Sequence, residues 1–351
     1  MNNADVVING RGLDLPTNGI PRYMREILLH LDDLLKNEKL RVDLVIPQDS
    51  TFDCSYANIN IVKLPDGILW DFFSAEKYAR KNKALYINLA SKGVIYKHSI
   101  STIHDIRVLR ERSNVSYRAM KTKFRIMLSY MLAVRNAENI VTVSQFSKRE
   151  ISDYYNVPSE KIYVIGNGWE HLKSVKEDDT IFMEYPDIEK KKYYFSLGSI
   201  APHKNFKWII ENKKKYPEIQ YVVMGKVDTN IWEDTTDELK DIIYVGYQSD
   251  GRMLSLMKNA KALVFPSVYE GFGIPPLEAL ACGIPVFVAN IPVMRELFEN
   301  SVYYFEPEDY GYDLDDSLEK CHIEKADKIL CEHSWEKSAK CWLELIKMKV
   351  R

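Results

Sequence analysis

The stretch SVYEGFGIPPLEALACGIPV, residues 267–286, places two glutamates, Glu270 and Glu278, on either side of a Gly-Phe-Gly turn and two prolines. The apolar run KALVFPS, residues 261–267, leads into it and predicts a buried strand. Proline is tolerated in the first turn of a helix and glycine commonly ends one, so Leu277–Cys282 is predicted to be a short helix. Glu270 then lies in a loop beyond the carboxyl end of a strand, and Glu278 lies in the first helical turn.

Strand-and-helix units of this kind recur along both halves of the chain. Short β-branched runs predict strands in the first half at residues 6–9, 42–47, 59–64, 84–89, 100–105, 139–144 and 162–167. Further strands are predicted in the second half at residues 193–199, 219–225, 242–246, 261–267, 284–289 and 302–306. The clearest helical pattern covers residues 20–34. Two such series predict an α/β protein with two parallel sheets, which bind ligands outside the carboxyl ends of their strands.

The charged segment 171–192 has no periodicity and is predicted to link two domains, residues 1–175 and 176–332. The last segment, residues 333–351, predicts one amphipathic helix with Ser334 as its N-cap. Such a helix must bury its apolar face against another element.

Composition excludes several classes of protein. The chain has 351 residues, 46% of them apolar, which is enough for about two domains with large cores. A net charge of −2 argues against a dedicated nucleic-acid binder. The five cysteines form no C-x-x-C pair, which predicts free thiols in a reduced compartment. The N-terminus lacks a signal-peptide pattern and no long apolar run occurs, so we expect a cytoplasmic protein without a membrane span.

The opening stretch also indicates a ligand. Backbone N–H groups of a glycine loop at a helix start can bind an anion, and carboxylates accept hydrogen bonds from sugar hydroxyls. An anion together with hydroxyls indicates a nucleotide sugar. The alternative is that the glycines only make a tight turn and that the helix dipole favours Glu278, by roughly 0.3–1 kcal/mol.

Glu270 and Glu278, with seven residues between them, resemble the E-x7-E signature of retaining glycosyltransferases with the GT-B fold, in the large family-4 group. The resemblance covers most of the chain and includes the segments TNGIPRYMREILLHL, STIHDIRVL, IVTVSQFSKREI, KIYVIGNGWE, YFSLGSIAPHKNF and VGYQSDGRMLSLMKNAKALVFPS. It implies two Rossmann-like domains facing across a cleft. The first would hold the acceptor and the second the nucleotide sugar, and the final helix would return to the first domain.

The resemblance also implies roles for single residues. Lys204 would neutralise the diphosphate of the donor, Glu278 would bind ribose hydroxyls, and Glu270 would bind hydroxyls of the transferred sugar. The remaining implied donor contacts are Gly19, Ser199, Gly246, Tyr247, Gly271, Phe272, Gly273 and Ile274. Ser199 stands near the position where the family often carries an arginine. The alternative to a phosphate-binding role is that Lys204 is an ordinary surface lysine in contact with water.

His104 ends the predicted strand STIHD, and the resemblance places it near the transferred sugar, so the implied catalytic set is His104, Lys204 and Glu270. A structural hydrogen bond is the alternative for this histidine. The D-x-D pattern at Asp313 and Asp315 occurs in metal-using transferases of another fold, but its place before SLEK predicts a helix start. No cluster of His and Cys has zinc spacing, so no metal and no other cofactor is expected.

Residues 107–125 carry seven Arg or Lys and one acid, with apolar residues between them. They predict either a solvated helix face or a patch for peripheral contact with an anionic membrane or a lipid-linked pyrophosphate.

The expected function is transfer of a hexose or deoxyhexose from a nucleotide-diphosphate sugar to a hydroxyl of a glycan or lipid-linked saccharide. By resemblance, the reaction retains anomeric configuration, needs no metal and belongs to surface polysaccharide, O-antigen or capsule biosynthesis. The alternatives are a non-catalytic nucleotide-sugar-binding subunit and a nucleotide-sugar epimerase of the same fold.

Overall fold

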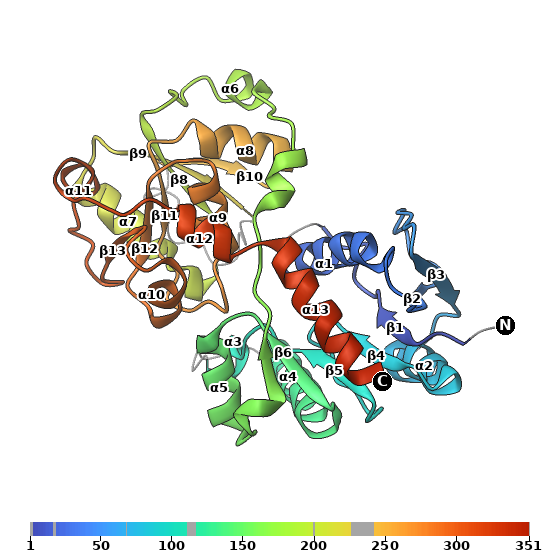
Figure 1. Ribbon diagram of the computed structural model, residues 1–351. Coiled ribbons are helices and arrows are strands. Elements are labelled where there is room, and N and C mark those ends of the chain that lie inside the picture. Colours follow the sequence, from blue (N-terminus) through green and yellow to red (C-terminus); the bar gives the residue numbers. More distant parts are fainter. Residues whose placement is uncertain are drawn as a thin grey trace. The chain divides into compact units, whose positions relative to one another are not determined.

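The computed structural model describes residues 3–16, 19–67, 69–110, 117–198, 201–225 and 242–350 (Figure 1). The chain forms two compact units. Unit 1 holds Met1–Asn167 and His333–Arg351, and unit 2 holds Gly168–Glu332. The division therefore falls after residue 167, whereas the sequence predicts it after residue 175.

Unit 1 is built on one parallel sheet in the order β3-β2-β1-β4-β5-β6-β7. Its strands are β1 Val6–Asn9, β2 Val42–Pro47, β3 Ile59–Leu64, β4 Leu85–Asn88, β5 Ser99–Thr102, β6 Asn139–Thr142 and β7 Ile162–Val164. Its α-helices are α1 Gly19–Leu35, α2 Lys77–Asn82, α3 Arg107–Arg110, α4 Tyr117–Asn136, α5 Gln145–Tyr155 and α13 Trp335–Val350. Central strands such as β1 and β4 are buried along their whole length, which is why they read as continuous apolar runs.

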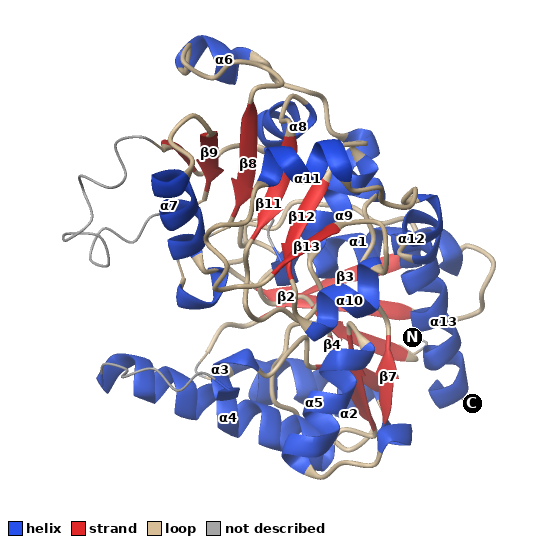
Figure 2. Cartoon of the chain, turned by 90° about the vertical axis from the view of Figure 1, so that its left-hand side faces the viewer, coloured by secondary structure: helices blue, strands red, loops and turns tan. Residues whose placement is uncertain are grey.

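Unit 2 repeats this plan with a parallel sheet in the order β10-β9-β8-β11-β12-β13 (Figure 2). Its strands are β8 Tyr193–Leu197, β9 Gln220–Met224, β10 Ile243–Gly246, β11 Ala262–Phe265, β12 Val286–Ala289 and β13 Tyr303–Phe305. Its α-helices are α6 Thr180–Glu184, α7 Phe206–Lys215, α8 Asp250–Lys258, α9 Ile274–Ala281, α10 Pro292–Phe298, α11 Leu314–Lys320 and α12 Asp327–Glu332.

Every strand predicted from the sequence is confirmed, but several end earlier than predicted. The strand predicted at 100–105 stops at Thr102, and the one predicted at 162–167 stops at Val164. The residues beyond these ends lie in loops at the carboxyl edge of the sheet. The strand order reverses once in each sheet, between β1 and β4 and between β8 and β11, as in Rossmann-like folds.

The prediction that residues 171–192 form a linker is wrong. The segment contains most of a 3-10 helix, Glu170–Ser174, together with α6, and it belongs to unit 2. Ile181 and Ile188 are buried and fix it to the rest of the unit. Two widely spaced apolar residues are enough to anchor a segment, but they produce no periodicity that a sequence pattern could detect.

The predicted C-terminal helix is confirmed as α13, and it packs on α1 within unit 1. On this helix, the indole Nε1 of Trp342 donates a hydrogen bond to the hydroxyl of Tyr23 at 2.8 Å, and both rings are buried. Trp335 packs edge-on against the same tyrosine. Ser338 Oγ donates to the carbonyl of Gly166 at 2.8 Å, which ties the helix to the end of the first chain segment.

Replacing Trp342 by Phe should destabilise unit 1 by about 1–3 kcal/mol, because the buried hydroxyl of Tyr23 loses its partner. Urea unfolding followed by fluorescence and circular dichroism would measure the loss. Met348→Ala on the same helix is the control, since this side chain is 57% exposed and its removal should change stability by less than about 0.5 kcal/mol. Equal midpoints for the Trp342→Phe variant and the wild type would contradict the structural role of this contact.

Candidate functional site

Two predicted site residues, Lys204 and Glu270, meet in unit 2 where the strand order reverses. Lys204 ends the 3-10 helix Pro202–Lys204 after β8, and Glu270 lies in the loop after β11. Because β8 and β11 are neighbours, their carboxyl ends bring the two loops together. Lys204 Nζ lies 2.6 Å from Glu270 Oε1, and the side chains are 23% and 16% exposed. The pair is therefore screened from water only in part and remains reachable by a ligand.

Local contacts hold the lysine in place. Its Nζ lies 5.1 Å from the ring centre of Phe265, the last residue of β11, in a cation–π arrangement. The N–H of Val268 donates to the carbonyl of His203 at 2.8 Å, which joins the two loops. Asn205 takes a left-handed conformation with φ 50° and leads the chain into α7. A cation is thus fixed beside a carboxylate by backbone geometry.

The Gly-Phe-Gly turn leads into α9, which begins earlier than predicted. The helix starts at Ile274 rather than Leu277, because both prolines fit the first turn, where their missing N–H groups cost nothing. Gly273 is the N-cap with φ 121°, and a Cβ there would lie 2.9 Å from Met294 Cε, so only glycine fits. Since prolines carry no N–H, the amides of Gly273 and Ile274 are the donors at this helix start.

Glu278 lies elsewhere than its sequence position predicts. It falls in the second turn of α9 and is only 3% exposed. Its Oε1 is 2.8 Å from Nε2 of His171, a residue that the sequence analysis assigned to a linker. The two positions are 107 residues apart in the chain, and no spacing signal connects them. The sequence analysis therefore missed His171, which fixes the orientation of this candidate site carboxylate.

The other predicted donor contacts differ in exposure. Phe272 is buried, so its side chain serves the core of unit 2 and only its backbone is available to a ligand. Gly246 ends β10 with φ 66°, and Tyr247 beside it is 61% exposed. Gly19 is the first residue of α1 and belongs to unit 1. Ser199 lies outside the described residues.

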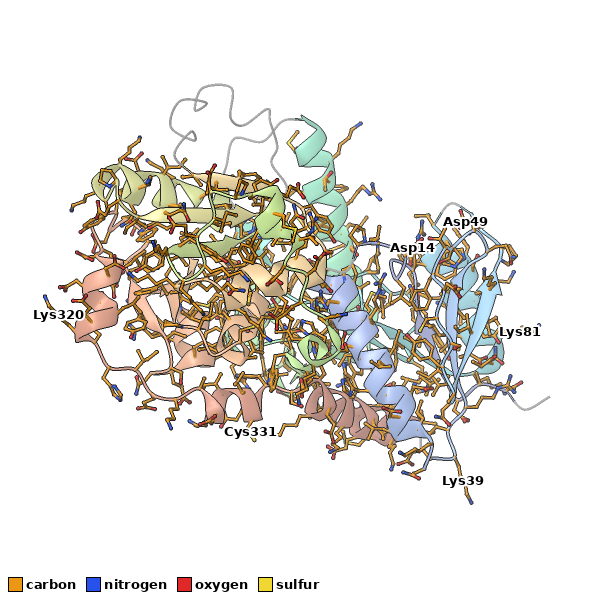
Figure 3. The ribbon with its side chains drawn as sticks, turned by 90° about the horizontal axis from the view of Figure 1, so that it is seen from above. Asp14, Lys39, Asp49, Lys81, Lys320 and Cys331 are labelled. Carbon is orange, nitrogen blue, oxygen red and sulfur yellow. The ribbon has the colours of Figure 1, made fainter. Side chains whose placement is uncertain are left out.

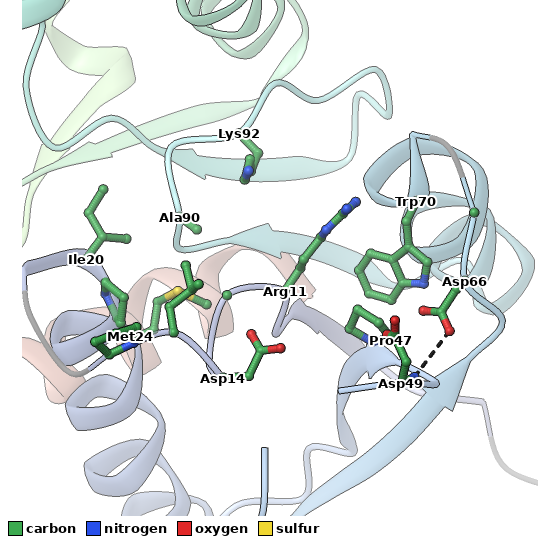
Figure 4. Close-up of a pocket in the computed structure, with 15 residues that line it drawn as sticks. Arg11, Asp14, Ile20, Met24, Pro47, Asp49, Asp66, Trp70, Ala90 and Lys92 are labelled. Carbon is green, nitrogen blue, oxygen red and sulfur yellow. Dashed lines mark hydrogen bonds between the residues drawn. The ribbon is translucent and has the colours of Figure 1, made fainter. Parts of the chain in front are cut away.

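A second candidate site lies in unit 1, again where the strand order reverses. A cavity of about 740 Å³ opens at the carboxyl ends of β1 to β4 (Figure 4). Arg11 and Asp14 come from the loop after β1, Asp49 and Asp66 follow β2 and β3, and Lys92 follows β4. Asp14 and Asp49 lie at the same end of unit 1, away from Lys39, which precedes β2 (Figure 3).

The wall of this cavity combines charged side chains with apolar ones. Arg11 Nη1 lies 3.4 Å from Asp71 Oδ2, and its guanidinium is 6.0 Å from the ring centre of Trp70. The N–H of Asp49 donates to Asp66 Oδ2 at 3.2 Å, as the dashed line in Figure 4 marks. Trp70 is 1% exposed, and its indole N–H has no hydrogen-bond partner among the described residues. The cavity therefore combines donors and acceptors with a buried aromatic ring.

His104 lies in unit 1 beyond the end of β5 and is partly buried. Its Nε2 is 3.0 Å from the carbonyl oxygen of Leu89, and its ring packs edge-on against Tyr23 with centroids 4.8 Å apart. Burial lowers the pKa of His104 to about 4, although the bond to Leu89 opposes this shift. A carbonyl only accepts, so Nε2 carries the proton of the neutral ring and Nδ1 is left as an acceptor.

Two predictions about metal chemistry can be compared with the structure. Asp313 is the N-cap of α11, with its side chain accepting from the N–H of Asp316, so the predicted helix start is confirmed. Asp315 pairs with Lys261 and Tyr194. Among the described residues, no group of three His, Cys, Asp or Glu side chains could hold a metal ion. Independence of a metal stays a prediction.

Two Rossmann-like units with these strand orders define the GT-B fold, and solved structures share it. Sucrose-phosphate synthase from Thermosynechococcus elongatus superposes with a TM-score of 0.73 at 16% identity, covering 98% of both chains. Anabaena Alr3699/HepE, solved in complex with UDP-glucose, gives a TM-score of 0.69 at 14% identity over 98% of this chain and 99% of that one.

Family models narrow the class. The model of glycosyltransferase family 4 matches residues 17–171, and the model of glycosyl transferases group 1 matches residues 177–320. The chain therefore carries the two domains of these glycosyltransferases, one in each half.

Curated relatives agree with this assignment. The O-antigen chain mannosyltransferase RfbU of Salmonella typhimurium is 35% identical over 234 residues, which are 65% of this chain and 62% of that protein. The O-antigen chain mannosyltransferase B of Escherichia coli is 28% identical over 61% of this chain and 58% of its own length. The match thus spans less than two thirds of either relative.

The pKa of His104 leads to a pH-dependent stability. Its folded value of about 4 lies below the ordinary value, so the unfolded chain binds the proton more readily. This contribution to the free energy of unfolding is complete above about pH 6.5 and is lost as the pH falls toward 4. His104→Gln, which cannot titrate, should lose less stability than the wild type between pH 7 and pH 5 in urea unfolding. Identical losses in the two proteins would show that the imidazole is not desolvated.

Proposed function

We propose that this protein is a glycosyltransferase that moves a hexose from a nucleotide-diphosphate sugar to a hydroxyl of a glycan or lipid-linked saccharide. The observation that carries the proposal is the Lys204–Glu270 pair beside the glycine turn of α9, at the point where the strand order of unit 2 reverses. The names of the two mannosyltransferase relatives favour mannose as the sugar and O-antigen biosynthesis as the setting.

The donor diphosphate would bind between Lys204 and the amides of Gly273 and Ile274. A fixed ammonium and backbone N–H groups stabilise the charge that grows on the leaving diphosphate without reorganising during the reaction. Glu270 Oε1 lies 2.6 Å from Lys204 Nζ. A diphosphate would therefore compete with Glu270 for the lysine and release this carboxylate to accept hydrogen bonds from sugar hydroxyls.

The nucleoside would lie along the same edge of the sheet of unit 2. Glu278 is proposed to accept from the ribose through Oε2, because Oε1 is already bonded to His171. Binding at a side chain that is 3% exposed requires the residues above it to move. The exposed ring of Tyr247 is proposed to contact the base, and Gly246 leaves that position open.

The proposed reaction retains configuration and uses no protein nucleophile. The acceptor hydroxyl attacks the anomeric carbon on the face that the diphosphate leaves, and its proton passes to a phosphate oxygen of the leaving group. Glu270 serves by holding sugar hydroxyls rather than by forming a covalent bond. His104 is neutral near pH 7 and offers Nδ1 as an acceptor, which suits a role in orienting a hydroxyl but not in stabilising negative charge.

The acceptor is proposed to bind in the cavity of unit 1. Its charged lining residues are Arg11 and Lys92 against Asp14, Asp49 and Asp66, which gives two positive and three negative charges. This balance disfavours a phosphate and favours a neutral sugar ring, whose hydroxyls both donate and accept. A lipid-linked acceptor would present such a sugar at a membrane surface.

A panel of UDP, GDP, dTDP and ADP sugars in a thermal-shift assay would test the function and identify the donor. A ligand that binds only the folded protein raises its stability with concentration, so the true donor should stand out. Turnover that requires an added acceptor would separate a transferase from an epimerase, which needs the nucleotide sugar alone. Binding without turnover on any acceptor would indicate a non-catalytic subunit.

Two variants test the donor site in opposite directions. Lys204→Ala should weaken nucleoside diphosphate binding by about 10²-fold, because the ammonium contact is lost. Glu270→Gln should tighten diphosphate binding by about threefold, since a repelling carboxylate is removed, while turnover of the nucleotide sugar falls by about tenfold or more. Isothermal titration calorimetry and steady-state kinetics give both quantities.

The matched control is Glu299→Gln, which breaks an exposed ion pair with Lys328 elsewhere in unit 2 at a similar distance of 2.7 Å. It should leave diphosphate affinity and turnover unchanged. Should Lys204→Ala keep the affinity of the wild type, the donor site is misplaced.

The acceptor cavity has its own test. Methyl α-mannopyranoside should give saturation-transfer NMR signals with the wild type and weaker ones with Asp14→Asn, whereas the donor-dependent thermal shift should stay the same. The control is Asp53→Asn, an exposed acid of unit 1 outside the cavity. Displacement of the sugar by inorganic pyrophosphate would indicate a phosphate site instead.

A further inference from the structure

The indole N–H of Trp70 is a buried donor on the wall of the unit 1 cavity. Trp70 is 1% exposed and lines the cavity, beside the side chain of Arg11 (Figure 4). Its Nε1 has no hydrogen-bond partner within the described part of the chain. Most buried polar atoms in folded proteins are hydrogen-bonded, and an unpaired donor costs free energy. The unpaired N–H therefore indicates that a ligand atom supplies the acceptor.

Other buried indoles of this protein do have partners. Trp342 donates to the hydroxyl of Tyr23 at 2.8 Å, and Trp208 donates to the carbonyl of Asp309 at 2.9 Å. Neither of these tryptophans lines the cavity. Among the buried side-chain atoms of the described residues that lack a partner, the nitrogen of Trp70 is the one that belongs to the cavity wall. The missing bond and the cavity thus occur at the same residue.

The backbone next to the cavity wall adopts rare conformations. Among the described residues of unit 1, four residues other than glycine have positive φ angles, and two of them are ordinary left-handed helix ends. The other two are Leu69 at 58° and Ser91 at 55°, and each comes directly before a residue of the wall, Trp70 or Lys92. Trp70 also precedes a π-helix, Asp71–Glu76. Left-handed residues and π-helices are both frequent at ligand-binding sites.

A hydrogen-bonded network fixes the neighbours of Trp70. Arg11 Nη1 lies 3.4 Å from Asp71 Oδ2, and Nδ2 of the buried Asn9 donates to Asp71 Oδ1 at 2.9 Å. Asn9 Oδ1 in turn accepts from the backbone N–H of Arg11 at 2.9 Å. Both oxygens of Asp71 are therefore engaged by other residues, which explains why the adjacent carboxylate does not serve as the acceptor for the indole. The wall is held in place, and its one unpaired donor is left for a ligand.

We propose that Trp70 determines the specificity of the acceptor cavity, and that its indole N–H donates to one hydroxyl oxygen of the acceptor sugar. This inference rests on the proposed sugar transfer and names the group that selects the acceptor. An indole nitrogen only donates, so the recognised atom must accept, as a sugar hydroxyl does. A site with a buried donor matched to one hydroxyl discriminates against the analogue that lacks it, because the donor then stays unpaired.

A set of deoxy sugars tests this role. The probes are methyl α-mannopyranoside and its four derivatives that each lack one hydroxyl, and titrations of the full chain followed by saturation-transfer NMR give their dissociation constants. At one hydroxyl, deoxygenation should weaken binding to the wild type by about tenfold. The variant Trp70→benzothienylalanine carries a sulfur in place of the N–H at nearly the same volume. It should bind the parent sugar about tenfold more weakly than the wild type does and bind that one derivative equally well.

The matched control is Trp342→benzothienylalanine, which removes a buried indole N–H that is bonded to Tyr23. It should lower the thermal midpoint and keep the sugar preferences of the wild type. The same replacement at Trp70 should not lower the midpoint, because no bond within the protein is lost. Trp70→Phe is the second variant and should lose the same preference.

Trp70 variants that discriminate among the five sugars as the wild type does overturn the proposal. Failure of all five sugars to bind the wild type overturns it as well. In both cases an intact donor-dependent thermal shift would leave the proposed sugar transfer standing. Loss of that shift with every nucleotide sugar would instead count against the transfer itself.

Discussion

The reversal of strand order in each parallel sheet is the constraint on which both candidate sites depend. On either side of this point the helices connect to opposite faces of the sheet, so the loops that leave neighbouring strands diverge and a space opens between them. The chain does this twice, between β1 and β4 and between β8 and β11. In unit 1 the space is a cavity with charged and apolar lining residues, and in unit 2 it holds the Lys204–Glu270 pair.

The two candidate sites differ in the charges of the residues that form them. In unit 2, Lys204 lies near the start of α9, where two prolines in the first turn leave few amide N–H groups. An ammonium beside such amides suits an anion. The neighbouring carboxylate of Glu270 balances the charge of Lys204. In unit 1 three acids and two bases share one cavity, and such a wall suits hydroxyls better than phosphate. This contrast underlies the proposal that unit 2 binds the diphosphate and unit 1 a neutral acceptor.

Two helices of unit 1, α13 and α4, both bury apolar side chains against the rest of the unit. α13 comes from the far end of the chain and buries Trp335 and Trp342 against α1, where the buried polar atom of Trp342 has a partner. Burial of such large aromatic rings stabilises the domain that begins the chain. α4 also packs apolar side chains inward, but its Met120 and Phe124 are exposed. Part of the basic segment at residues 107–125 lies outside the described residues, and its contact with a membrane stays a prediction. Within the described part of the chain no helix is long and apolar enough to span a membrane.

The sequence by itself determined the number, order and parallel nature of the strands, because buried strands appear as short apolar runs and helices as periodic ones. It also determined that Lys204 and Glu270 belong to loops at strand ends, and that Asp313 and Ser334 start helices. Only the tertiary structure decided that Glu278 is buried against His171 and that the supposed linker packs into unit 2. It also decided that apolar side chains of α4 are exposed. Local patterns reflect the period of a strand or helix, whereas contacts between residues far apart depend on how completed elements pack, and no local period encodes that.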